Sequence, residues 1–278
     1  MSHLAEGLRR KGRHSTSSRL ASDLRRAVEN EDLHLAYQPI IDLSDGTTHA
    51  VEALSRWEHP ALGPIGPTEF VAIAERSSTI HKLTAWALRT ACADLAQWQA
   101  IYPSAVELAV AVNVSSTCFG DVKFVEIVAE TLARTNVHPR HLILELTETA
   151  AADPATTLLG NAARLRRMGV RIALDDFGVG YSSLGRLATV PITDLKLDRT
   201  LTSPALEEVL CAALLRATMG LATDLGINLI AEGVEIAAQL DLLRRQGCRY
   251  VQGNLLAMPR PAEIIAAELA LLSGTFRS

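Results

Sequence analysis

The 278-residue chain is 48% hydrophobic and 21% charged, so it can bury a large core and intrinsic disorder is excluded. Its 27 Lys and Arg residues against 31 Asp and Glu give a net charge of −4, which argues against bulk nucleic-acid binding, and 4% aromatic residues are too few for a single-strand stacking platform. With no apolar run near the roughly 18 residues of a membrane span and no signal-peptide core, we expect a cytoplasmic protein without membrane or nucleic-acid partners.

The chain begins with a basic segment, residues 1–19, which carries five Lys or Arg residues and one acid. This segment predicts a solvated arm or a linker helix, with an RNA-binding or membrane-surface role as the alternative. From residue 20 onward there is no second linker, internal repeat or low-complexity stretch. We therefore expect residues 20–278 to form one domain, which suits an α/β barrel of about 250 residues.

Short apolar runs then alternate with longer amphipathic stretches. The expected strands are 33–41, 48–57, 106–114, 142–147, 171–176, 192–198, 228–233 and 250–253. The expected helices are 83–99, 124–135, 156–169 and 206–226. Strands that alternate with helices form right-handed βαβ units, and eight such strands predict a closed barrel with a parallel sheet.

The first two runs are joined by DLSDGT (42–47), which is too short to hold a crossover helix. Two strands with so short a connection form an antiparallel hairpin. The expected fold is therefore an irregular TIM-type (β/α)₈ barrel of the α/β class, with an antiparallel first strand.

Polar residues concentrate in these runs, mostly at or near their carboxyl ends. They are Gln38, Glu52, Arg56, Asn113, Glu145, Asp175, Asp176, Lys196, Glu232 and Gln252. Strands of a parallel barrel are buried on both faces and should be almost entirely apolar. One carboxylate could be a salt-bridged structural residue, but five from several strands indicate a site at the mouth of the barrel, where strand ends meet.

The acidic residues of this group suit divalent metal ions. Carboxylate and amide oxygens are hard ligands, typical of Mg²⁺ or Mn²⁺ sites. Five carboxylates and one ammonium leave four negative charges, which two divalent ions would balance. Two ions that clamp the attacking and leaving oxygens are the recurring machinery of phosphodiester hydrolysis.

Two basic residues have both a functional and a structural interpretation. Lys196, one of only four lysines, lies inside an expected strand, and buried lysine is rare unless it is paired or functional. Its structural alternative is a salt bridge to Asp194 or Asp198. Arg56 suits a phosphate through its bidentate fork, and its alternative is a surface ion pair with Glu58.

Other candidate motifs fail on spacing. Cys92, Cys118, Cys211 and Cys248 are far apart and predict reduced, mostly buried thiols. The pair of histidines in HPRH (138–141) is split by a proline, which indicates a loop end rather than a helical zinc site.

Eight motifs follow one another in order. They are YQPII (37–41), VEALSRWEHP (51–60), VNVS (112–115), ELTE (145–148), DDFGVGYSSL (175–184), DLKLD (194–198), AEGVE (231–235) and VQG (251–253). Together they resemble the EAL-domain cyclic-di-GMP phosphodiesterases, over about residues 20–265. The resemblance implies hydrolysis of cyclic di-GMP to linear pGpG by a barrel that is usually dimeric, with Mg²⁺ or Mn²⁺ as cofactor.

The resemblance also implies roles for single residues. The metal ligands would be Glu52, Asn113, Glu145, Asp175, Asp176 and Glu232, with Glu232 as an alternative general base. Lys196 would orient the attacking water, and Gln252 would hold the site together. Substrate contacts would come from Gln38, Arg56, Gln252 and Glu235, and Glu148 would anchor the 175–184 loop.

Three positions depart from the family pattern, namely Ser78, Val179 and Asn254, and none is an implied metal ligand. The leading hypothesis is an active phosphodiesterase. A receptor that binds cyclic di-GMP without cleaving it is the second, although receptors typically lose a ligand or the lysine. A scaffold that acts through residues 1–19 is the third, and it leaves the carboxylates unexplained.

Overall fold

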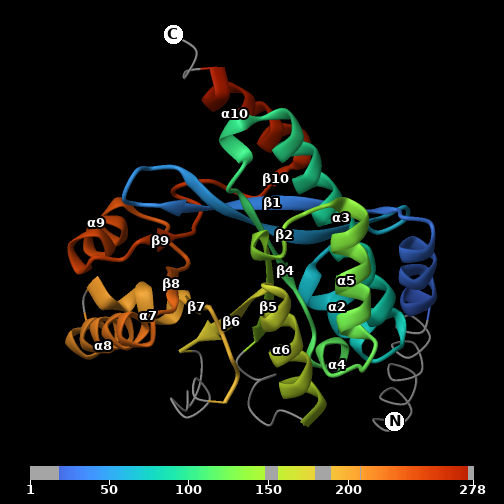
Figure 1. The fold of residues 1–278 in the computed structure, drawn as a ribbon, viewed down its shortest axis with the longest axis horizontal. Helices are drawn as coiled ribbons and strands as arrows, with labels where there is room; N and C mark the ends of the chain where they lie inside the picture. The colour runs from blue at the N-terminus through green and yellow to red at the C-terminus, as the bar shows by residue number, and fades with distance from the viewer. Residues whose placement is uncertain (1–18, 148–155, 179–188, 207, 275–278) are drawn as a thin grey trace, which may run out of the picture.

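The computed structural model describes residues 19–147, 156–178, 189–206 and 208–274, and in them one sheet closes on itself as an eight-stranded barrel (Figure 1). The barrel strands are β1 (Leu33–Asp42), β2 (Thr48–His59), β4 (Ala109–Asn113), β5 (Leu142–Thr147), β6 (Arg171–Phe177), β7 (Asp194–Leu197), β8 (Asn228–Ala231) and β9 (Tyr250–Val251). Two short strands, β3 (Gly63–Ile65) and β10 (Arg260–Pro261), extend it. All eight expected strands are confirmed.

The first strand runs against its neighbours. β1 is antiparallel to β2, where Gln38 faces Glu52, and antiparallel to β9, while every barrel pair from β2 through β9 is parallel. The expected hairpin and the irregular TIM-type barrel are therefore confirmed. The parallel register sets Asn113 beside Glu145, so side chains from neighbouring strands lie at one level.

Helices surround the barrel. They are α2 (Pro67–Glu75), α3 (Thr79–Ile101), α4 (Ser116–Phe119), α5 (Phe124–Thr135), α6 (Thr156–Met168), α7 (Arg199–Thr202), α8 (Val209–Leu225), α9 (Ala237–Gln246) and α10 (Ala262–Gly274), with 3₁₀ turns η1 (Pro103–Ala105), η2 (Pro139–His141) and η4 (Pro204–Leu206). A further helix covers residues 19–29 of the described chain. The four expected helices are confirmed, whereas α2, α9 and α10 were not expected. Among the described residues, no helix is both long and apolar enough to cross a membrane.

Side chains alternate between two cores along each strand. In β4, Val110 and Val112 pack outward in the large core under the helices, while Ala109 and Ala111 belong to a small cluster inside the barrel. Successive side chains of a strand point to opposite faces. Asn113, two residues after Ala111, therefore continues the inward series. The same count carries Glu52, Glu145, Asp175 and Glu232 into the barrel mouth, because each lies two residues after an inward-facing apolar residue.

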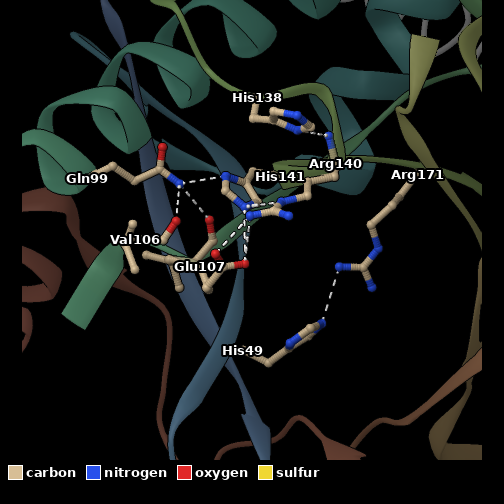
Figure 2. A network of polar contacts seen from close by, with 9 residues as sticks. His49, Gln99, Val106, Glu107, His138, Arg140, His141 and Arg171 are labelled. Atoms are coloured by element: carbon tan, nitrogen blue, oxygen red, sulfur yellow. Dashed lines mark hydrogen bonds and ion pairs between the residues drawn. The ribbon is translucent and has the colours of Figure 1, made fainter. Parts of the chain in front are cut away.

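The amino ends of the strands carry a separate polar network (Figure 2). Arg171 donates to the fully buried carboxylate of Asp194, which also accepts from Thr193 and Asn228, and Arg171 lies 3.2 Å from His49 Nε2. At the same end, His141 lies between Gln99 and Arg140. In barrels this face serves stability rather than catalysis. The HPRH segment forms η2 here, as the proline indicated.

Candidate active site

The ammonium of Lys196 lies at the centre of the barrel mouth. Lys196 is the third residue of β7, and its side chain is 1% exposed. Four carboxylates from other strands or strand ends surround its Nζ atom. The distances are 2.7 Å to Glu232 Oε1, 3.0 Å to Glu145 Oε2, 3.3 Å to Asp175 Oδ1 and 3.5 Å to Glu52 Oε2.

The structural alternative for Lys196 is wrong. Asp194 is occupied by Arg171 at the other end of the barrel, and the Asp198 side chain accepts from the Thr200 backbone N–H at the start of α7. The lysine is instead the counter-charge of a cluster assembled from distant parts of the sequence. Buried charges persist only when they are paired in this way.

Amide side chains fix the orientation of Glu52. Asn113 Nδ2 donates to Glu52 Oε1 and Gln252 Nε2 to Glu52 Oε2, both at 2.7 Å. Gln252 Nε2 also lies 3.1 Å from Gln38 Oε1, and Gln38 Nε2 lies 3.4 Å from Asn254 Oδ1. Gln38, Glu52, Asn113 and Gln252, which the sequence analysis assigned to one site, therefore lie together. No sequence pattern indicated that Asn254 would hold Gln38.

Burial sets the protonation of the cluster. It raises the pKa of Glu145 well above its usual value and that of Glu232 to about 8, because Lys196 only partly offsets the lost hydration and the neighbouring negative charges. Burial also raises the pKa of Asp175. The pKa of Glu52 is lowered instead. Burial alone would raise it, but the charge of Lys196 and the hydrogen bonds from Gln252 and Asn113 outweigh that effect. The four carboxylates in turn outweigh burial and raise the pKa of Lys196, which stays charged.

We expect the metal-free protein to lose thermal stability as the pH rises from about 6.5 to about 8. A carboxyl group whose pKa is higher in the folded than in the unfolded state binds more protons when folded, so the free energy of unfolding falls between the two values. Glu232, raised from 4.5 to about 8, and Glu145 act in this window. Burial lowers the pKa of His49 from 6.5 to about 4, so this histidine makes stability rise with pH, but only below about pH 6.5.

Scanning calorimetry of EDTA-treated protein at several pH values measures this trend. Saturating Mg²⁺ should flatten it, because coordination requires ionised ligands. A melting temperature that rises between pH 6.5 and 8 without metal would contradict the assignment of raised carboxyl pKa values.

The donor set fits divalent ions. Within the described chain, Glu145 Oε1 is buried and accepts no hydrogen bond, which is costly for a carboxylate oxygen and leaves a lone pair for a cation. Oxygen donors from carboxylates and an amide are those that Mg²⁺ and Mn²⁺ prefer. Among the described residues, no three acidic, histidine or cysteine side chains are already arranged around one ion, because the carboxylates converge on Lys196 instead.

A cavity of about 470 Å³ opens beside the cluster, between the ends of β2, β4 and β5 and the helices α2 and α3. Its wall is mostly apolar, and Arg56, Asn113 and Glu145 line one side. Arg56 donates to the Ser55 carbonyl oxygen and, in the described chain, forms no ion pair with Glu58. Mostly apolar cavities with a few polar groups are typical sites for flat organic ligands.

Two of the expected site residues that the structure describes, Asp176 and Glu235, are not part of the cluster. Asp176 is exposed, with a left-handed φ of 58°, and its backbone N–H donates to Asp175 Oδ1. Glu235 is exposed and lies 3.8 Å from Arg199. Glu148 lies outside the described residues, as do Val179 and most of the 175–184 loop.

Gly253 allows the backbone next to Gln252 to approach Val234. A Cβ atom at this position would lie 2.2 Å from the Val234 carbonyl oxygen, where backbone cannot give way. We expect Gly253→Ala to destabilise the fold by about 1–3 kcal/mol and to weaken ligand binding by displacing Gln252. Urea unfolding measures the first effect.

The matched control is Gly160→Ala in α6, where a Cβ atom meets nothing within 4 Å. This change should be neutral or slightly stabilising, because alanine favours a helix. Equal stability of the two variants would show that the close approach at Gly253 is not a constraint.

Comparison with known families gives one match that spans the barrel. The profile described as "EAL domain" matches residues 21–259. The bifunctional diguanylate cyclase/cyclic di-GMP phosphodiesterase MucR of Pseudomonas aeruginosa is 39% identical over 251 residues, which are 90% of this chain and 36% of MucR. The cyclic di-GMP phosphodiesterase NbdA of the same organism is 38% identical over 87% of this chain and 31% of its own length. The chain thus spans about a third of these relatives.

Solved structures give the same result. The PaMucR phosphodiesterase in complex with c-di-GMP has a TM-score of 0.82 at 39% identity, over 89% of this chain and 99% of that chain. The EAL domain of Xanthomonas citri FimX in complex with c-diGMP has a TM-score of 0.81 at 25% identity, over 90% and 97% of the two chains.

Proposed function

The chain belongs to the EAL-domain family, as its motifs indicated, and from this premise we propose that it is a metal-dependent phosphodiesterase that hydrolyses cyclic di-GMP to linear 5'-pGpG. The observation that carries the proposal is the set of four carboxylates within 3.5 Å of Lys196 Nζ at the barrel mouth. Relatives named as cyclic di-GMP phosphodiesterases support the substrate.

The carboxylates and one amide would hold two Mg²⁺ or Mn²⁺ ions. The proposed ligands are Glu52, Asn113, Glu145, Asp175, Asp176 and Glu232. When bound, such ions supply charge that activates a water and stabilises the phosphoryl oxygens. The hydrogen bonds from Asn113 and Gln252 would keep Glu52 oriented before the ions arrive.

Lys196 would orient the attacking water, and Glu232 would accept its proton. The ammonium of Lys196, 2.7 Å from Glu232 Oε1, would donate a hydrogen bond to the water, and Glu232, as the alternative to metal ligation, would accept the proton. The water oxygen bonds to phosphorus, the bond from phosphorus to the ribose 3'-oxygen breaks, and solvent at the open mouth protonates that oxygen. The product keeps a 5'-phosphate and is linear.

The substrate would lie across the mouth. Arg56, on the wall of the 470 Å³ cavity, offers its fork to a phosphate, and the apolar wall suits a purine base. Gln38, held by Asn254 and the Ala257 carbonyl, would contact the phosphate side. Glu235 would face the guanine on the other side, and Glu148 would anchor the 175–184 loop.

Product analysis tests the proposal. Purified protein is incubated with cyclic di-GMP and Mg²⁺ or Mn²⁺ beside Glu52→Gln, and products are resolved by chromatography while calorimetry measures binding. We expect linear pGpG from the unmodified protein and none from the variant. Tight binding without product in either metal would instead support the receptor.

Three further expectations concern the whole protein. Residues 1–19 would form a basic arm ahead of a domain at 20–278, and the family match from residue 21 supports this boundary. We also expect a homodimer in the cytoplasm, without nucleic-acid or membrane partners. Light scattering of the purified chain, with and without residues 1–19, checks the oligomeric state and the independence of the arm.

A further inference from the structure

The cluster at the barrel mouth has one positive charge for four carboxylates. Lys196 is the only Lys or Arg among the described residues with an ion pair to Glu52, Glu145, Asp175 or Glu232. Its side chain is 1% exposed and that of Glu145 is 1% exposed, so water screens little of the charge. With all four carboxyl groups ionised, as metal coordination requires, one ammonium would leave three negative charges at this site.

The ammonium of Lys196 also lies among the oxygen atoms that would coordinate the metal ions. The carboxylates converge on Nζ, and no three of the described acidic side chains share an ion position as they stand. Yet Glu145 uses only Oε2 toward the lysine, while its buried Oε1 has no hydrogen-bond partner among the residues that the structure describes. The cluster is therefore held by the lysine and still has coordination capacity unused.

From this geometry we infer that Lys196 is an internal substitute for the metal ions: its ammonium holds the carboxylates together in the metal-free protein and competes with divalent cations for the same oxygens. This inference rests on the metal-binding part of the proposed function and goes beyond the water-orienting role of the lysine. Binding of ions must then displace some contacts of Nζ with Glu145, Asp175 or Glu232.

If the inference is correct, removal of the ammonium lowers the stability of the metal-free protein and raises its affinity for metal ions. The metal-free fold weakens, because four buried carboxylates lose their counter-charge. Metal affinity rises, because the ions no longer compete with a fixed positive charge about 3 Å from their ligands.

Calorimetric titration with MnCl₂ in the absence of nucleotide tests this directly. The variant Lys196→Met keeps the length of the side chain and removes its charge. At pH 8.5 we expect Mn²⁺ to bind it about tenfold more tightly than the unmodified protein, which corresponds to about 1.4 kcal/mol. The control is Lys82→Met, since Lys82 is 57% exposed and pairs with Glu29 rather than with a carboxylate of the cluster.

A second measurement uses the unmodified protein and so does not depend on the folding of a variant. The chain has only four lysines, at positions 11, 82, 123 and 196, so lysine-selective ¹⁵N labelling gives four ammonium signals. The buried one should exchange slowly with water in EDTA. Addition of Mg²⁺ should shift it and speed its exchange, while the other three stay unchanged.

The outcomes separate this inference from the proposed function. Tighter Mn²⁺ binding by Lys196→Met, or a variant that folds only with Mn²⁺, supports the inference. Unchanged or weaker binding overturns it and leaves the metal site standing, and an unmoved Lys196 signal in saturating Mg²⁺ does the same. Failure of the unmodified protein to bind either ion would remove the metal site itself and the inference with it.

Discussion

Replacement of Lys196 with methionine is expected to lower kcat for cyclic di-GMP hydrolysis by about 10³-fold, the usual cost of losing a preorganised donor at a reacting centre. Lys196 Nζ lies 2.7 Å from Glu232, so one lost group removes both the donor to the water and the partner of the proposed base. The dinucleotide should still bind, because its expected contacts lie on Arg56 and Gln38. Chromatographic rates at saturating Mg²⁺ measure the loss.

The exposed Lys82→Met serves as the control and should keep the rate of the unmodified protein. If Lys196→Met retained more than about a tenth of the rate, the role of the ammonium in the chemical step would be refuted. A proportional loss of binding and rate would instead indicate a collapsed mouth.

Arg171→Met should reduce the free energy of unfolding by about 3–5 kcal/mol, because it leaves the buried carboxylate of Asp194 without a positively charged partner. The Asp194 side chain is fully buried, and Arg171, itself 14% exposed, donates through Nε at 3.0 Å and again through Nη2. Thr193 and Asn228 still donate to Asp194 in the variant, but neither supplies a positive charge. Urea unfolding of the metal-free protein measures the change.

The matched control is Arg140→Met at the same end of the barrel (Figure 2). Arg140 is 56% exposed and its partner Glu107 is 71% exposed, so water screens their pair. Such pairs contribute about 0–1 kcal/mol. Losses of similar size in the two variants would contradict the assignment of a stabilising role to the buried pair.

The barrel and its mouth could both be predicted from the alternation of inward-facing and outward-facing side chains along the strands. In β4, β5 and β6 the inward positions Ala111, Ile143 and Ala173 are each followed two residues later by a polar residue. A polar side chain at the end of a buried strand is conspicuous in sequence. Three such ends, from separate parts of the chain, point to one mouth.

Other features lacked a sequence signal. The helix α10 carries no clear apolar stripe, because its hydrophobic residues fall on all sides of the helix. The convergence of four carboxylates on Lys196, rather than on an empty point, depends on side-chain rotamers. The pairing of Asp194 with Arg171 likewise joins residues that are distant in sequence and adjacent only through the register of β6 and β7.

Hydrolysis in oxygen-18 water tests the central claim most directly. Metal-stripped protein is mixed with cyclic di-GMP in labelled water, Mg²⁺ or Mn²⁺ is added, and mass spectrometry reads the product. The account predicts linear pGpG with one oxygen-18 atom in its terminal phosphate, formed only after the metal is added. Intact cyclic di-GMP in both metals, or unlabelled product, would contradict it.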